Sequence, residues 1–145
     1  MPWITENVAI AGAGISAENW NEVRGHGFTA IVNLRSERQD AFVEPLPDAY
    51  LWLPTEDHTD PPPENLLLGA RFIDGCVNSG KRVLIHCKMG IHRSATMAVA
   101  YLIFTGLSKE DAIRKLAENG PRLYGTEENH KTLDKFLDFL AKSHA

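Results

Sequence analysis

Residues 83–94 read Val-Leu-Ile-His-Cys-Lys-Met-Gly-Ile-His-Arg-Ser, and the fold can be worked out from this stretch. The apolar run Val83–Ile85 is typical of a buried strand, and the apolar segment Ala95–Phe104 is typical of a helix. A tight loop that starts at Cys87 joins the two. Such a loop turns successive backbone N–H groups toward one point. The positive N-terminal end of the following helix dipole is directed to the same point. The stretch therefore predicts an anion-binding loop that contains a thiolate.

The residues of this loop have side chains that suit phosphate chemistry. Helix N-termini and nearby cations favour the thiolate form of cysteine, so Cys87 is the candidate nucleophile. The planar guanidinium of Arg93 matches two phosphate oxygens. Ser94 is expected to donate a hydrogen bond to the Cys87 sulfur, and His86 to point away from the loop and fix its base by a backbone hydrogen bond. The predicted phosphate-binding loop consists of Lys88, Met89, Gly90, Ile91, His92 and Arg93.

The spacing of Cys87 and Arg93 has to be weighed against chance. A cysteine followed six positions later by arginine arises in on the order of a tenth of chains of this composition. A buried cysteine at a strand end is also commonly an inert core thiol. Gly90 removes a side chain from the curve of the loop, and Ser94 with the strand–loop–helix setting completes the motif. The catalytic interpretation is therefore favoured.

The remaining chain alternates between strand and helix patterns. This alternation predicts an α/β fold with a central, mostly parallel sheet of four to five strands, flanked by helices on both faces. The phosphate-binding loop then lies between the last strand and the following helix, at the carboxyl ends of the strands. One domain over residues 1–145 is expected. Further strands are predicted at 8–11, 29–34 and 50–53, and helices at 16–24, 39–43, 64–79, 95–105, 108–119 and 126–141.

Composition excludes several partner classes. The formal net charge of −4 gives no overall attraction to nucleic acid. No apolar run approaches the ~20 residues that span a bilayer, and the first residues lack the pattern of a signal peptide. The two cysteines, Cys76 and Cys87, form no CxxC pair, which predicts a reducing, cytoplasmic location and no zinc site. Cys76 is expected to be a core thiol.

The string HCxxGxxRS after a strand resembles the signature of the cysteine-based protein tyrosine phosphatase superfamily, in particular its small atypical dual-specificity group. The longer string HCKMGIHRSATMAVAYLI and the segment Ser108–Ile113 carry the same resemblance. Lys88 and the run Ser94–Met97 are similar to the branch that includes the mitochondrial phosphatidylglycerophosphate phosphatases. The resemblance covers Tyr50 to the C-terminus well and the first two strands loosely.

This resemblance implies an aspartate that protonates the leaving oxygen from a mobile loop before the preceding helix. Asp57 lies where the resemblance places this acid, between Leu53 and Pro61. Asp60 is the alternative acid, although it directly precedes a proline, which favours extended geometry there. Asn129 lies roughly where some relatives carry a water-positioning glutamine, but we expect it to be a surface residue of the last helix.

The reaction implied by the resemblance is phosphomonoester hydrolysis through a phosphocysteine intermediate, without a metal or another cofactor. The expected substrates are phosphoproteins or phosphopeptides that carry phosphotyrosine, and also phosphoserine or phosphothreonine. A phospholipid or phosphoinositide headgroup is the alternative. Lys88 suits such a polyanion, whereas Ile91 stands where many phosphoinositide phosphatases have a second lysine. A non-catalytic phosphate-binding module is less favoured, because nucleophile, arginine and acid are all present.

Overall fold

The computed structural model describes residues 3–12, 14–87, 92–119 and 127–143, and its centre is one four-stranded sheet. The strands lie in the order β1-β4-β2-β3, and every neighbouring pair is parallel. They are β1 (Val8–Ala11), β2 (Phe28–Arg35), β3 (Ala49–Thr55) and β4 (Arg82–His86). The helices are α1 (Trp20–Gly25), α2 (Pro63–Asn78), α3 (His92–Phe104), α4 (Lys109–Glu118) and α5 (Glu127–Ser143). The predicted α/β class and parallel sheet are confirmed.

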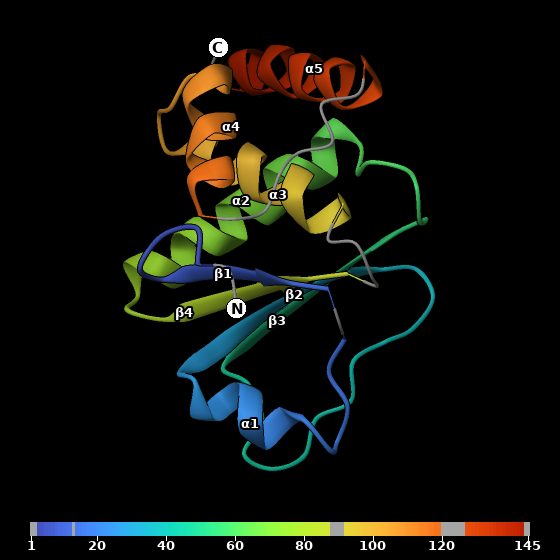
Figure 1. Cartoon of the computed structure of the whole chain (residues 1–145), viewed down its shortest axis with the longest axis vertical. Helices are drawn as coiled ribbons and strands as arrows, with labels where there is room; N and C mark the ends of the chain where they lie inside the picture. The colour runs from blue at the N-terminus through green and yellow to red at the C-terminus, as the bar shows by residue number, and fades with distance from the viewer. Residues whose placement is uncertain (1–2, 13, 88–91, 120–126, 144–145) are drawn as a thin grey trace.

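Helices cover both faces of the sheet, but unequally. Figure 1 shows α1 alone on one face and the other four helices on the opposite face, with α5 farthest from the sheet. The inner strands β2 and β4 are buried along almost their whole length. Their continuous apolar runs reflect this burial on two sides, which is the usual situation of parallel strands. The carboxyl ends of the strands therefore share one edge, and Cys87 follows β4 at that edge.

Two helix predictions need correction. The helix expected to be capped by Ser16 starts only at Trp20, because residues 17–19 form a turn. In this turn the Ser16 Oγ accepts the Asn19 N–H at 3.3 Å, and the Ser16 N–H donates to Asn19 Oδ1 at 2.9 Å. No helix forms at residues 39–43, where the Ala41 N–H instead donates to Ile15 O at 3.0 Å. By contrast, the helix predicted at 108–119 forms, and Ser108 caps it: the Ser108 Oγ accepts the Asp111 N–H at 3.1 Å.

Close packing positions α3 above the sheet. A Cβ added to Gly69 of α2 would lie only 2.6 Å from Met97 Sδ of α3. Because interiors are packed this densely, a larger residue at 69 would force the Met97 side chain to move. The absence of a side chain at Gly69 therefore leaves room for the Met97 side chain between α2 and α3.

Among the described residues, no helix is both long enough and apolar enough to cross a membrane.

Candidate active site

Cys87 is the first residue after β4 and is completely buried. Its backbone N–H donates to Ala11 O of the neighbouring strand at 3.4 Å, which extends the sheet by one more contact. The loop side chains at Lys88, Met89, Gly90 and Ile91, and the side chain of His92, lie outside the described residues. The predicted contacts of these five residues with a phosphate group therefore stay predictions. Arg93 and Ser94 are described and lie in the first turn of α3.

Arg93 is fully buried and held by residues that the sequence did not indicate. Its Nη1 donates to Glu37 Oε1 at 2.7 Å and its Nη2 to Glu37 Oε2 at 3.1 Å. This is a two-point carboxylate pair, the strongest kind of charged hydrogen bond in proteins. Nη1 also donates to the Thr55 carbonyl oxygen at 2.7 Å. The guanidinium is thus joined to the segment after β2 and to the end of β3.

The charges around Arg93 keep it protonated. Burial alone would lower the pKa of its guanidinium, since the charged form loses hydration. The hydrogen bond to Glu37 and the negative charges of Cys87, Glu37 and Asp57 act in the opposite direction, and together they raise the pKa above its ordinary value. Arg93 is therefore a permanent positive charge beside Cys87.

The two candidate acids have different surroundings. Asp57 Oδ1 lies 3.6 Å from Arg93 Nη2, and the Asp57 side chain is 45% exposed. The Asp60 carboxylate instead accepts hydrogen bonds from Thr96 Oγ1 at 2.9 Å and from Asn129 Nδ2 at 3.0 Å. Because both of its oxygens already accept hydrogen bonds from these donors, Asp60 is a poor candidate for delivering a proton to a ligand. Asp57 is the aspartate beside the arginine.

Asp57 lies in a tight turn between β3 and α2. The Thr59 N–H and Thr59 Oγ1 both donate to Glu56 O, at 3.2 and 2.6 Å. The Asp57 Oδ1 accepts the His58 N–H at 3.0 Å. His58 has a φ of 63°, a left-handed conformation that is uncommon for residues other than glycine and is found at functional sites. The turn presents Asp57 toward the Arg93 guanidinium.

His86 is oriented by a side chain rather than by a backbone group, which corrects the prediction. Its Nε2 lies 2.6 Å from Asp40 Oδ2, and both side chains are fully buried. Asp40 also pairs with Arg35 Nη2 at 2.8 Å and accepts the Ile15 N–H at 3.0 Å. Since a carboxylate only accepts hydrogen bonds, His86 carries its proton on Nε2 when Asp40 is ionised. This buried cluster anchors the residue directly before Cys87.

Two further predictions differ from the structure. Ser94 is buried, and its Oγ makes no hydrogen bond within the part of the chain that is described, so the expected bond to the Cys87 sulfur is not observed. Asn129 is not a surface residue: it is 1% exposed, because its amide points inward to Asp60. A helical pattern alone gives no reason to bury an asparagine between Glu128 and His130.

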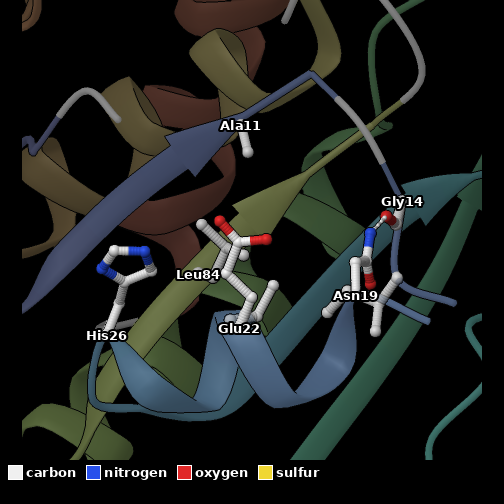
Figure 2. A pocket seen from close by; sticks show the side chains of 8 residues that line it. Ala11, Gly14, Asn19, Glu22, His26 and Leu84 are labelled. Carbon is white, nitrogen blue, oxygen red and sulfur yellow. Dashed lines mark hydrogen bonds between the residues drawn. The ribbon is translucent and has the colours of Figure 1, made fainter. Parts of the chain in front are cut away.

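Other candidate groups lie apart from this site. Cys76 is buried in α2, and burial raises the pKa of its thiol, as expected for a core thiol. Within the described ranges, no group of three or more His, Cys, Asp or Glu side chains could hold a metal ion. A cavity of about 200 Å³ lies on the α1 face of the sheet, with Glu22 and His26 at its rim and Leu84 at its floor (Figure 2). It is smaller than the roughly 300 Å³ at which ligand pockets begin, and no residue of the cysteine loop lines it.

Replacing Glu37 by alanine is expected to lower kcat/KM for an aryl phosphate by about 10- to 100-fold, the cost of misplacing a catalytic group by an ångström or so. The reason is that Arg93 loses both of its hydrogen bonds to the Glu37 carboxylate, which fix the orientation of the guanidinium. Competitive inhibition by inorganic phosphate checks the cause, because its inhibition constant should rise with the loss. Glu22→Ala, on the α1 face, is the matched control and should leave both values unchanged. Wild-type phosphate inhibition in Glu37→Ala would contradict this role.

A buried cysteine at the carboxyl edge of a parallel sheet, with an arginine in the first turn of the next helix and an aspartate beside that arginine, defines the class of cysteine-based phosphatases. Comparison with known proteins agrees. Residues 14–138 match the family described as "Dual specificity phosphatase, catalytic domain". This match covers most of the chain, and the chain therefore belongs to the dual specificity phosphatase catalytic-domain family.

Curated relatives match the chain over part of their length. "Serine/threonine/tyrosine-interacting protein A" of Xenopus laevis is 33% identical over 97 residues, which cover 63% of this chain and 44% of the relative. "Dual specificity protein phosphatase 5" of Homo sapiens is 37% identical over 78 residues, covering 53% of this chain and 20% of the relative. The chain thus matches less than half of the length of these relatives.

Solved structures match nearly the whole fold. "Tk-PTP in the active form" has a TM-score of 0.79 at 29% identity, with 94% of this chain and 95% of that chain covered. "PTPMT1 in complex with PI(5)P" has a TM-score of 0.80 at 23% identity, with 98% and 97% covered. The second likeness concerns the fold alone.

Proposed function

We propose that this protein hydrolyses phosphotyrosine, and also phosphoserine and phosphothreonine, in phosphoproteins or phosphopeptides through a phosphocysteine intermediate. The observation that carries the proposal is the convergence at Arg93. This residue of the cysteine motif is buried beside Cys87 and has Asp57, 36 positions earlier in the chain (93 − 57), 3.6 Å from its guanidinium. Family membership supports the same reaction class.

The first step forms the phosphocysteine. The Cys87 thiolate attacks phosphorus in line with the leaving oxygen, and a sulfur–phosphorus bond forms as the phosphorus–oxygen bond breaks. Arg93 and the backbone N–H groups of the loop stabilise the charge on the three equatorial oxygens. Asp57 gives its proton to the departing oxygen, so that an alcohol or phenol leaves rather than an alkoxide or phenolate.

The second step releases phosphate. Asp57, now ionised, takes a proton from a water molecule as the water oxygen attacks phosphorus. The sulfur–phosphorus bond breaks, and its electron pair returns to Cys87 as thiolate. Asp57 ends protonated, ready for the next substrate. Its 45% exposure suits both tasks, because the carboxyl group has to meet a leaving group and then a water.

A phospholipid or phosphoinositide headgroup is the second candidate substrate. Lys88 in the cysteine loop supports it, since an additional cation there suits a polyanionic headgroup. The carboxylates of Glu37 and Asp57, which lie near Arg93, oppose it. A non-catalytic phosphate-binding module is a third hypothesis. The Xenopus laevis relative is named an interacting protein rather than a phosphatase. This hypothesis is less favoured because Cys87, Arg93 and Asp57 are all present.

A substrate panel tests the proposal. Release of phosphate is measured from phosphotyrosine and phosphothreonine peptides, from vesicles containing phosphatidylinositol phosphate, and from nucleotides, with Cys87→Ser as the background. We expect the peptides, phosphotyrosine first, to be hydrolysed fastest. Hydrolysis of the lipid alone would replace the peptide assignment by the lipid one. Phosphate binding without turnover of any substrate would indicate the non-catalytic module.

A further inference from the structure

The Asp60 carboxylate accepts hydrogen bonds from side chains of two helices, α3 and α5. Thr96 Oγ1 of α3 donates to Asp60 Oδ1 at 2.9 Å, and Asn129 Nδ2 of α5 donates to Oδ2 at 3.0 Å. Thr132 Oγ1, one turn further along α5, lies 3.1 Å from Oδ2. Its single proton is shared with Glu128 O at 3.0 Å, so this third bond is the weaker one. Thr96 and Asn129 are buried.

These hydrogen bonds connect the loop that carries Asp57 with α5, the helix farthest from the sheet (Figure 1). Figure 1 shows the first turn of α5 above the green segment that connects β3 with α2. The contacts that the structure describes for residues 56–59 are made within their own turn, apart from the approach of Asp57 to Arg93. Asp60 therefore provides the connection between the turn and the helices.

The chain between Asp60 and Asp57 is short and stiff. Asp57 lies only three positions before Asp60, and the turn at 56–59 is closed by the Thr59 bonds to Glu56 O. On the other side, the prolines at 61–63 restrict the backbone that leads into α2. A displacement of Asp60 is thus passed on to the Asp57 carboxylate rather than absorbed between them.

We propose that Asp60, Asn129 and Thr132 form a latch that holds the Asp57 loop in its working position, so that the C-terminal helix α5 takes part in leaving-group protonation without touching substrate. Asp60 and Asn129 are positioning residues in this arrangement. The proposal rests on the proposed function in one respect, that Asp57 is the proton donor. It gives the otherwise unexplained burial of an asparagine in α5 a role in the reaction.

The leaving-group dependence of turnover distinguishes this latch from a purely structural contact. Phenyl phosphate needs the proton donor because its phenol has a pKa of about 10, whereas p-nitrophenyl phosphate has a stabilised leaving group. For Asn129→Ala and Asp60→Asn we expect kcat/KM to fall about 10- to 100-fold with phenyl phosphate and less than about threefold with p-nitrophenyl phosphate. The inhibition constant of inorganic phosphate should stay at the wild-type value, because Cys87 and Arg93 are untouched.

Three further variants sharpen the test. Thr132→Val removes the weaker bond and should produce a smaller loss of the same kind. The double variant Asp60→Asn with Asn129→Asp exchanges donor and acceptor, and should recover part of the phenyl phosphate activity. Glu64→Gln, an exposed carboxylate in the first turn of α2, is the control and should behave as wild type. Equal losses on both aryl phosphates in Asn129→Ala would overturn the latch.

Hydrogen exchange in the protein without ligand tests the latch independently of turnover. The amides of residues 56–60 should exchange faster in Asn129→Ala and Thr132→Val than in wild type, while those of Glu64→Gln should not change. Unchanged exchange in the first two variants would contradict the latch even if the enzyme is active. A wild-type protein that hydrolyses neither aryl phosphate would refute the proposed function. The hydrogen-exchange result would still show whether the latch holds residues 56–60 in place.

Discussion

Replacing Cys87 by serine is expected to abolish phosphate release while phosphate binding is retained. A serine hydroxyl at neutral pH is a far weaker nucleophile than a thiolate, and loss of a covalent nucleophile costs on the order of 10⁴- to 10⁶-fold in turnover. The site for the phosphoryl group itself is kept, because Arg93 retains Glu37 and Thr55 O as partners. Turnover of a phosphotyrosine peptide and calorimetric binding of inorganic phosphate measure the two properties separately.

Cys76→Ser is the matched control for this variant. Cys76 is the second cysteine of the chain and lies buried in α2, in the same hydrophobic core. Serine at this position buries a hydroxyl and lowers the free energy of unfolding, but it leaves the loop after β4 unchanged. Full turnover in Cys76→Ser together with none in Cys87→Ser is the expected pair of results. Near wild-type turnover in Cys87→Ser would refute the phosphocysteine mechanism.

Asp57→Asn is expected to lower kcat by roughly 10²- to 10⁴-fold, the usual contribution of a general acid. The amide keeps the shape of the side chain and its place near Arg93 Nη2, but it has no proton to give to the leaving oxygen. The loss should be largest for substrates with poor leaving groups, such as phosphoserine and phenyl phosphate. Steady-state kinetics on a series of aryl phosphates measures this dependence.

Glu56→Gln provides the control for Asp57→Asn, since Glu56 is an exposed carboxylate in the same turn. It should change kcat little. The comparison with Asp60→Asn is the more informative one. If Asp60 only positions the turn, its amide variant loses less than Asp57→Asn and is partly rescued by Asn129→Asp. A larger loss in Asp60→Asn than in Asp57→Asn would mean that the acid has been assigned to the wrong aspartate.

The parts of the molecule that could be predicted are those whose cause is local in the chain. The strand before Cys87, the helix after it and the cap of α4 at Ser108 all follow from side chains within a few positions of each other. The parallel sheet follows from the alternation of such elements. The start of α1 was wrong by three residues (20 − 17), because the turn between Ser16 and Asn19 uses side-chain bonds that a periodic pattern does not show.

The partners of the motif residues could not be predicted, because they come from distant segments. Glu37 pairs with Arg93 across 56 positions, and Asp40 pairs with His86 across 46. Both acids lie in the irregular segment after β2, where the sequence has no periodicity that would indicate which side chains turn inward. Burying a polar group costs free energy unless it forms a hydrogen bond. Which group forms that bond is known only from the folded chain.

The chemistry offered by the cysteine loop was determined by the sequence alone, since Cys87, Arg93 and the strand and helix around them are contiguous. The sequence favoured Asp57 over Asp60 as the acid, but the different surroundings of these two aspartates were decided only by the tertiary structure. The donors that occupy Asp60 lie 36 to 72 positions away, on α3 and α5. Asp57 instead faces the Arg93 guanidinium. The local pattern shows that Asp60 precedes a proline, but it does not show that hydrogen bonds from distant helices reach Asp60.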